Sequence, residues 1–185
     1  MIIQSGGDST RMGEDKALRD FLGRPLIEHI LDRFSPLGQE TCIITNDPEE
    51  YRGLGYPLYS DVIPDRGALG GLYTALKVAS QPHVGLVACD MPFASPKLMR
   101  HLHQVLQETK ADAVLPSTEH SPEPMHAIYR RESCLPLVKQ AIEADQWRMI
   151  SWHEQGEVVI LSPEETQKVA PGQYTFWNLN TPDEF

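Results

Sequence analysis

The sequence predicts an α/β fold with a mostly parallel sheet. Short runs of β-branched and other apolar residues alternate with stretches whose apolar residues recur at helical spacing, which is typical of strands covered by helices. The 185 residues suit one compact domain, and 41% hydrophobic with 23% charged residues is ordinary globular usage. Because no repeat, low-complexity segment or flexible linker interrupts the chain, we expect a single domain over residues 1–185.

The expected strands are short and alternate with the expected helices. They cover residues 1–5, 41–45, 56–59, 84–89, 113–115, 125–129, 157–161 and 174–177. A helix opens at Pro25 and carries its apolar residues on one face. A second helix has its apolar residues at 69, 72, 73 and 76, a third follows the N-cap Ser95 and Pro96, and a fourth covers 134–144.

Both ends of the chain depart from this regular pattern. The first strand begins almost at the first residue, and Thr181 with Pro182 starts a helix that only three residues follow. We therefore expect trimming or disorder at both ends.

Charge and cysteine content exclude several classes of protein. The net charge of −10 argues against a general affinity for nucleic acid or anionic membranes. No apolar run approaches the roughly 20 residues of a membrane helix, and no secretory signal is visible. Cys42, Cys89 and Cys134 are scattered and form no CxxC motif, so a reducing cytoplasm is the expected location.

The first candidate binding segment, residues 6–16 (GGDSTRMGEDK), follows the first strand. Its two adjacent glycines allow the backbone to turn its N–H groups toward an anion, and Arg11 and Lys16 supply positive charge. It is neither a Walker A loop nor a GxGxxG motif. From the residues alone, a long loop with solvated charges is an equal alternative.

Two further segments follow expected strands. Residues 61–71 place Gly67, Gly70 and Gly71 before a helix, where glycine suits close approach of a ligand or a neighbouring strand, although such clusters are often simple turns. Asp90 ends a strongly apolar strand, where a carboxylate is costly unless a cation meets it. A divalent ion with phosphate is one such partner, and a turn-forming Asp before Pro92 is the structural alternative.

The remaining polar motifs are less specific. Residues 123–130 and 178–182 contain Asn, His and Thr-Pro that suit either ligand binding or turns and caps. His101 and His103 are expected on a helix surface. The three tryptophans are expected in packing, with one possible role in lining a ring-binding pocket.

Taken together, these motifs resemble one family. GGDSTRMGEDKAL resembles the signature loop GGxSxRMGxDKAL of the MobA-like nucleotidyltransferases, and the later landmarks follow in order as FLGRPLIEHIL, RGALGGLYTAL, CDMPF, EPMHAIYR and NLNTPDEF. The resemblance covers essentially the whole chain and implies a Rossmann-like, three-layer sheet of the nucleotidyltransferase type. The pair RMGxDKAL and NxNTP favours the molybdenum cofactor branch.

The resemblance also implies an activity, a cofactor and partners. The activity would be Mg²⁺-dependent transfer of GMP from GTP to the terminal phosphate of molybdopterin, which releases pyrophosphate and forms molybdopterin guanine dinucleotide. Acceptor molybdoenzymes or chaperones would be its protein partners. The implied nucleotide-binding residues are Gln4, Ser5, Gly6, Gly7, Lys16, Asn46, Asp61, Gly67, Gly70, Gly71 and Asp90. The implied catalytic residues are Lys16, Arg11 and Asp90, with Asp90 also the metal ligand, and the implied pterin-side residues are Arg148, Asn178 and Asn180.

One departure from the family leaves alternatives open. Gln4 and Ser5 stand where the family usually has Leu-Ala, so the choice between guanine and cytosine is not fixed. The alternatives are a molybdopterin cytidylyltransferase, a sugar-phosphate nucleotidyltransferase and a catalytically silent nucleotide-binding module.

Overall fold

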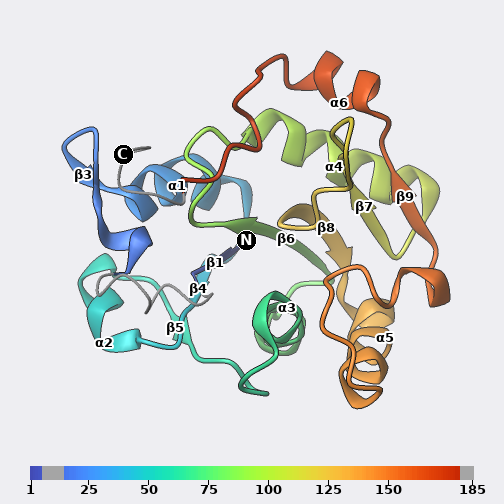
Figure 1. Ribbon diagram of the computed structural model, residues 1–185, viewed down its shortest axis with the longest axis horizontal. Helices are drawn as coiled ribbons and strands as arrows, with labels where there is room; N and C mark the ends of the chain where they lie inside the picture. Colours follow the sequence, from blue (N-terminus) through green and yellow to red (C-terminus); the bar gives the residue numbers. More distant parts are fainter. Residues whose placement is uncertain (6–14, 180–185) are drawn as a thin grey trace.

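A seven-stranded sheet forms the centre of the computed structural model, which describes residues 1–5 and 15–179 (Figure 1). Its spatial order is β5-β4-β1-β6-β8-β7-β9, and only β8 runs antiparallel to its neighbours β6 and β7. The mostly parallel sheet predicted from the sequence is therefore confirmed. The strands are β1 (Ile2–Gln4), β4 (Cys42–Ile44), β5 (Leu58–Tyr59), β6 (His83–Ala88), β7 (Ala113–Leu115), β8 (His126–Arg130) and β9 (Val158–Ile160).

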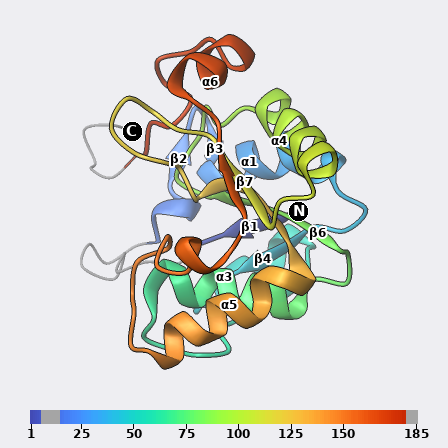
Figure 2. The ribbon, with the colours of Figure 1, turned by 90° about the vertical axis from the view of Figure 1, so that its right-hand side faces the viewer.

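Helices cover both faces of this sheet and complete three layers (Figure 2). One face packs against α1 (Leu26–Phe34), α4 (Pro96–Thr109) and the region of α6 (Pro163–Val169), and the other packs against α3 (Gly67–Val78) and α5 (Arg131–Glu143). Side chains of β1 alternate between the two cores, so Ile3 joins the first core and Ile2 the second.

Local sequence signals set several of these boundaries. The five apolar residues expected on one face of the first helix are all buried in α1. Ser95 caps α4 by accepting a hydrogen bond from the Leu98 N–H at 3.2 Å, and Pro96 follows at the first helical position, as predicted. Ser162 and Glu165 form a reciprocal capping box at the start of α6.

Residues 174–177, expected as a strand, instead form a turn. The Trp177 N–H donates to the Tyr174 carbonyl at 2.9 Å, and Thr175 bonds to the Gly172 carbonyl through its N–H and its hydroxyl. These local bonds occupy the backbone groups that a sheet ladder would require. The aromatic rings here pack on the Phe93 side chain, with Trp177 stacked on it at 6.1 Å between centroids.

Several short elements complete the described chain. A small hairpin pairs β2 (Asp20–Phe21) with β3 (Arg24–Pro25), and α2 (Pro48–Tyr51) lies between β4 and β5. Single 3₁₀ turns cover Lys16–Leu18, Ser35–Leu37, Arg52–Leu54 and His153–Gln155. Within residues 1–5 and 15–179, no helix combines the length and apolar character needed to cross a membrane. The final helix expected from Thr181 onward lies outside the described residues.

Candidate functional site

The carboxyl ends of β4, β1 and β6 lie side by side at one edge of the sheet, where open α/β sheets bind ligands. Backbone hydrogen bonds continue beyond the strands: the Ser5 N–H donates to the Ile44 carbonyl at 2.8 Å, and the Cys89 N–H donates to the Gln4 carbonyl at 3.1 Å. This register places the residue after β1 next to the residue that precedes Asp90.

Asp90 and Lys16 both lie at this edge. Asp90 is half-buried beyond the end of β6, and Lys16 begins the 3₁₀ turn that follows the glycine-rich segment. Burial raises the pKa of the Asp90 carboxyl, while a backbone hydrogen bond and the nearby positive charge of Lys16 oppose that rise. A carboxylate in this position is stabilised by any further cation that reaches it.

The donor set fits a metal ion that arrives with phosphate groups. In the described parts of the chain, no group of three or more His, Cys, Asp or Glu side chains could hold an ion by itself. Mg²⁺ is commonly bound by one or two carboxylates, with water and substrate phosphates as its other ligands. Asp90 alone can meet that requirement, whereas a protein cage for a resident ion would need more ligands.

Asn46 and Asp61 form a reciprocal pair at the ends of β4 and β5. The Asn46 Nδ2 donates to Asp61 Oδ2, and the Asp61 N–H donates to Asn46 Oδ1, both at 3.1 Å. The Thr74 hydroxyl of α3 lies 3.5 Å from Asp61 Oδ1 and accepts from the Val62 N–H at 2.9 Å. Two residues predicted to bind the nucleotide therefore fix each other's orientation.

The three predicted glycines have different surroundings. A Cβ at Gly67, where φ is +52°, would meet nothing within 4 Å, so this residue faces open space at the start of α3. A Cβ at Gly70 would lie 2.9 Å from the Arg66 Cβ, and one at Gly71 would lie 1.9 Å from the Gln4 Nε2. Close packing of the chain itself accounts for Gly70 and Gly71.

Gln4 lies beneath the first turn of α3 and is only 3% exposed. Its Nε2 donates to the Ala68 carbonyl at 3.3 Å, which fixes the amide orientation because the Oε1 could not replace the donor. Among the described residues, the Oε1 has no hydrogen-bond partner.

The predicted pterin-side residues occupy two different places. Asn178 lies in the C-terminal segment, where the Leu179 N–H donates to the Asp90 carbonyl at 3.0 Å. Arg148 is exposed in the turn region after α5, next to Trp147, whose ring lies 4.7 Å from the Arg66 guanidinium at the start of α3. Gly6, Gly7, Arg11 and Asn180 lie outside the described residues.

Sequence reasoning missed Tyr51 and the role of Asp15. Tyr51 is fully buried, and its hydroxyl bonds to both Ser5 and Asp15. Asp15 caps the turn that carries Lys16. The segment PEEYRGL contains no motif that marks the tyrosine, but an acidic residue directly before Lys16 is an N-cap signal.

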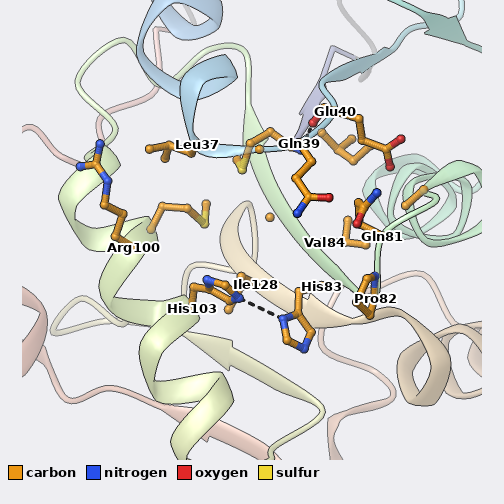
Figure 3. A pocket seen from close by; sticks show the side chains of 16 residues that line it. Leu37, Gln39, Glu40, Gln81, Pro82, His83, Val84, Arg100, His103 and Ile128 are labelled. Atoms are coloured by element: carbon orange, nitrogen blue, oxygen red, sulfur yellow. Dashed lines mark hydrogen bonds between the residues drawn. The ribbon is translucent and has the colours of Figure 1, made fainter.

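A cavity of about 230 Å³ lies at the opposite edge of the sheet, near the amino ends of β1 and β6 (Figure 3). His83 and His103 face each other there, with Nδ1 and Nε2 2.9 Å apart, so His103 is not a simple surface residue of its helix. None of the predicted site residues lines this cavity. The candidate site is the carboxyl edge.

Comparison with known proteins agrees with this architecture. Residues 1–158 match the model of the MobA-like NTP transferase domain. A "probable molybdenum cofactor guanylyltransferase" of Peptoclostridium acidaminophilum is 32% identical over 188 residues, covering 99% of this chain and 85% of that protein.

Solved structures extend the comparison to the fold. The crystal structure of molybdopterin-guanine dinucleotide biosynthesis protein A from Archaeoglobus fulgidus superposes with a TM-score of 0.84 at 27% identity, covering 99% of this chain and 93% of that one. The 2-C-methyl-D-erythritol 4-phosphate cytidylyltransferase of Thermus thermophilus, at 15% identity, a TM-score of 0.71 and coverage of 100% and 94%, shares the fold. The chain has a three-layer α/β fold and matches the family model over most of its length, and it therefore belongs to the MobA-like NTP transferase family.

Proposed function

We propose that this chain transfers GMP from GTP to the terminal phosphate of molybdopterin. The observation that carries the proposal is that Lys16 and Asp90 lie at the same carboxyl edge of the sheet, where the positive charge of Lys16 acts on the Asp90 carboxyl. The reciprocal Asn46–Asp61 pair and the open start of α3 at Gly67 lie on the same edge. The names of the relatives supply the substrates, since similar proteins are described as molybdenum cofactor guanylyltransferases.

The proposed reaction joins two anions. An oxygen of the molybdopterin phosphate forms a bond to the α-phosphorus of GTP, while the bond from that phosphorus to the bridging oxygen breaks and pyrophosphate leaves. Such transfers depend on positioning and charge neutralisation more than on a covalent intermediate. Lys16 would neutralise phosphate charge, and Arg11 would do the same from the glycine-rich segment. No side chain is required as a nucleophile.

Each remaining residue has a proposed place around these substrates. Mg²⁺ bound by Asp90 would supply further neutralisation of the phosphate charge. Asn46 and Asp61 would bind the ribose or base, and the nucleotide would lie over the backbone of Gln4, Ser5, Gly6 and Gly7. The open start of α3 at Gly67 would lie beside it, while the close packing at Gly70 and Gly71 would shape the floor of the pocket. The pterin would lie toward Arg148, Asn178 and Asn180.

Three broader expectations stay predictions alongside this function. They are a single domain over residues 1–185, a cytoplasmic location, and acceptor molybdoenzymes or chaperones as protein partners. Use of CTP on the same pterin is the competing activity, and Gln4 in place of the usual Leu is the observation that favours testing it.

The test is Asp90→Asn, which keeps the shape of the side chain and removes its charge. The rate of dinucleotide formation from GTP and molybdopterin in the presence of Mg²⁺ should fall by about 100-fold or more, as when an electrostatic stabiliser is lost. The melting temperature should not fall below the wild-type value, because burial disfavours that charge in the folded protein. Dinucleotide formation is followed by chromatography.

Asp32→Asn is the matched control, because it makes the same chemical change on an exposed residue of α1. Its turnover should equal that of the wild type. Full activity in Asp90→Asn would contradict the role given to this carboxylate.

A further inference from the structure

A series of buried and partly buried hydrogen bonds connects the residue before Asp90 to the residue before Lys16. The Cys89 thiol donates to the Ser5 hydroxyl at 3.4 Å, the Ser5 hydroxyl bonds to the Tyr51 hydroxyl, and the Tyr51 hydroxyl donates to Asp15 Oδ2. Cys89 immediately precedes Asp90 and Asp15 immediately precedes Lys16. The four residues come from four separate segments of the chain.

The direction of each bond follows from the groups involved. A carboxylate oxygen can only accept, so the single proton of the Tyr51 hydroxyl is committed to Asp15. The Ser5 hydroxyl must then donate to the Tyr51 oxygen, which leaves the Ser5 oxygen to accept from the Cys89 thiol. Each of these three protons therefore has a single acceptor, and the series of hydrogen bonds runs in one direction from Cys89 to Asp15. Burial also raises the pKa of the Tyr51 phenol, which keeps it a donor.

We propose that Tyr51 is a positioning residue for nucleotidyl transfer, whose hydroxyl holds the turn carrying Lys16 at a fixed place relative to Asp90. The inference rests on the proposed function of that edge. Tyr51 itself touches neither reacting group, and it acts through Asp15.

Asp15 transmits the constraint because both of its oxygens are engaged. Its Oδ1 accepts from the Ala17 N–H at 3.0 Å and so caps the turn Lys16–Leu18, while its Oδ2 accepts from Tyr51. Ala17 is fully buried, which anchors the middle of that turn in the core. Removing the Tyr51 hydroxyl frees one side of the cap and lets the turn shift.

Packing alone does not account for a tyrosine here. The ring is wholly buried in the core on the α1 and α4 side of the sheet, where phenylalanine would fill the same volume. A buried hydroxyl costs free energy unless its hydrogen bonds are made. In this structure those bonds lead only toward the two residues that flank the proposed chemistry.

The experiment compares Tyr51→Phe with the wild type under saturating GTP, Mg²⁺ and molybdopterin. We expect kcat to fall about tenfold with a smaller change in the KM for GTP, because displacement of Lys16 by a fraction of an ångström affects the transition state most. Tyr129→Phe is the matched control, since it removes another buried hydroxyl, which donates to the Pro124 carbonyl at 2.6 Å. That control should lose stability and keep its kcat.

A double-mutant cycle separates positioning from a structural role. If Tyr51 acts through Lys16, adding Tyr51→Phe to Lys16→Ala should change kcat by less than about twofold. Losses that multiply, or a Tyr51→Phe enzyme with normal kcat, would overturn the inference. Should Tyr51→Phe fail to fold, Ser5→Ala removes the upstream donor and is expected to lower kcat about threefold, with normal kcat again counting against it.

Failure of the proposed function would be seen separately. It would show as a wild-type protein that forms no dinucleotide from GTP. The same double-mutant cycle is then measured by nucleoside triphosphate binding, where Tyr51→Phe alone should weaken affinity by less than the tenfold expected for kcat, and should not weaken it further in Lys16→Ala.

Discussion

Gln4 is a polar residue in a layer that is otherwise apolar. Its neighbours on β1 and α3 are buried, and its amide fills the space that a Cβ at Gly71 would need. The amide makes one hydrogen bond at 3.3 Å, and among the described residues its oxygen has no partner. Leaving a buried acceptor unpaired costs about 1–3 kcal/mol. Gln4 is therefore a source of instability in the free protein.

Replacing Gln4 with Leu, the residue that the family usually has, should stabilise the protein. The volumes are similar, the unpaired oxygen disappears, and one weak hydrogen bond is lost. We expect a gain of about 1 kcal/mol, or roughly 2–4 °C in melting temperature for a protein of this size. Thermal unfolding of the ligand-free protein measures this, and a lower melting temperature for Gln4→Leu would show that the amide is fully satisfied.

At the scale of elements, His126 joins two layers at the start of β8. It is fully buried, and its ring meets the edges of Phe34 in α1 and Phe176 in the C-terminal segment at centroid distances of 5.7 and 5.9 Å. Burial, together with the positive charge of Arg33, lowers the pKa of His126 to about 4. The imidazole therefore holds these elements together only in its neutral form.

This burial predicts an acid-sensitive contact. In the unfolded chain His126 takes up a proton near pH 6.5, but in the folded protein only near pH 4. Its contribution is complete above pH 6.5 and is lost as the pH falls toward 4, by up to roughly 3 kcal/mol. In urea unfolding from pH 7 to 4, His126→Leu should lose less stability than the wild type.

His120→Leu, at an exposed position, is the control for that series and should follow the wild type. His153, whose pKa burial also lowers to about 4, remains in all three proteins and contributes equally to each. Parallel loss of stability in His126→Leu and the wild type would contradict the assignment.

Element length decided which parts of the fold could be predicted. Helices such as α1 and α4 span several turns, so their periodicity and the Ser95 cap identified them. The β2–β3 hairpin has two residues in each strand, too few to reveal an alternating pattern. Aromatic residues favour strands, and this preference misled the prediction for residues 174–177, where local turn bonds prevail. The α6 capping box was a usable signal that the prediction did not include.

The same contrast holds for the candidate site. Lys16 lies in the segment after β1 and Asp90 lies beyond the end of β6, so topology alone predicted both at one edge of the sheet. Tyr51 was not predictable, because its role depends on its hydroxyl reaching Ser5 and Asp15, which are distant in the sequence. Gly71 was expected to make room for a ligand or a strand, but its space is taken by the Gln4 side chain.

At the scale of the molecule, an acidic protein is proposed to bring together two anionic substrates. Its net charge of −10 repels them at long range, so binding depends on a few cations at the carboxyl edge. Lys16 lies at this edge, where its positive charge acts on the Asp90 carboxyl. A divalent ion that enters with the nucleotide would change the balance at this edge, and nucleotide binding should therefore require Mg²⁺.

Thermal unfolding with GTP, CTP, ATP and UTP, each with and without Mg²⁺, tests this at the level of the whole protein. A ligand at 100 times its dissociation constant stabilises by about 2.7 kcal/mol, which corresponds to roughly 5–10 °C at this size. We expect that shift with GTP and Mg²⁺ together, and a much smaller one with GTP alone or in Asp90→Asn. A shift with CTP alone would keep the site and change the product to the cytosine dinucleotide. The same shift with or without Mg²⁺ would mean that Lys16 and the backbone hold the phosphates without help from a metal at Asp90.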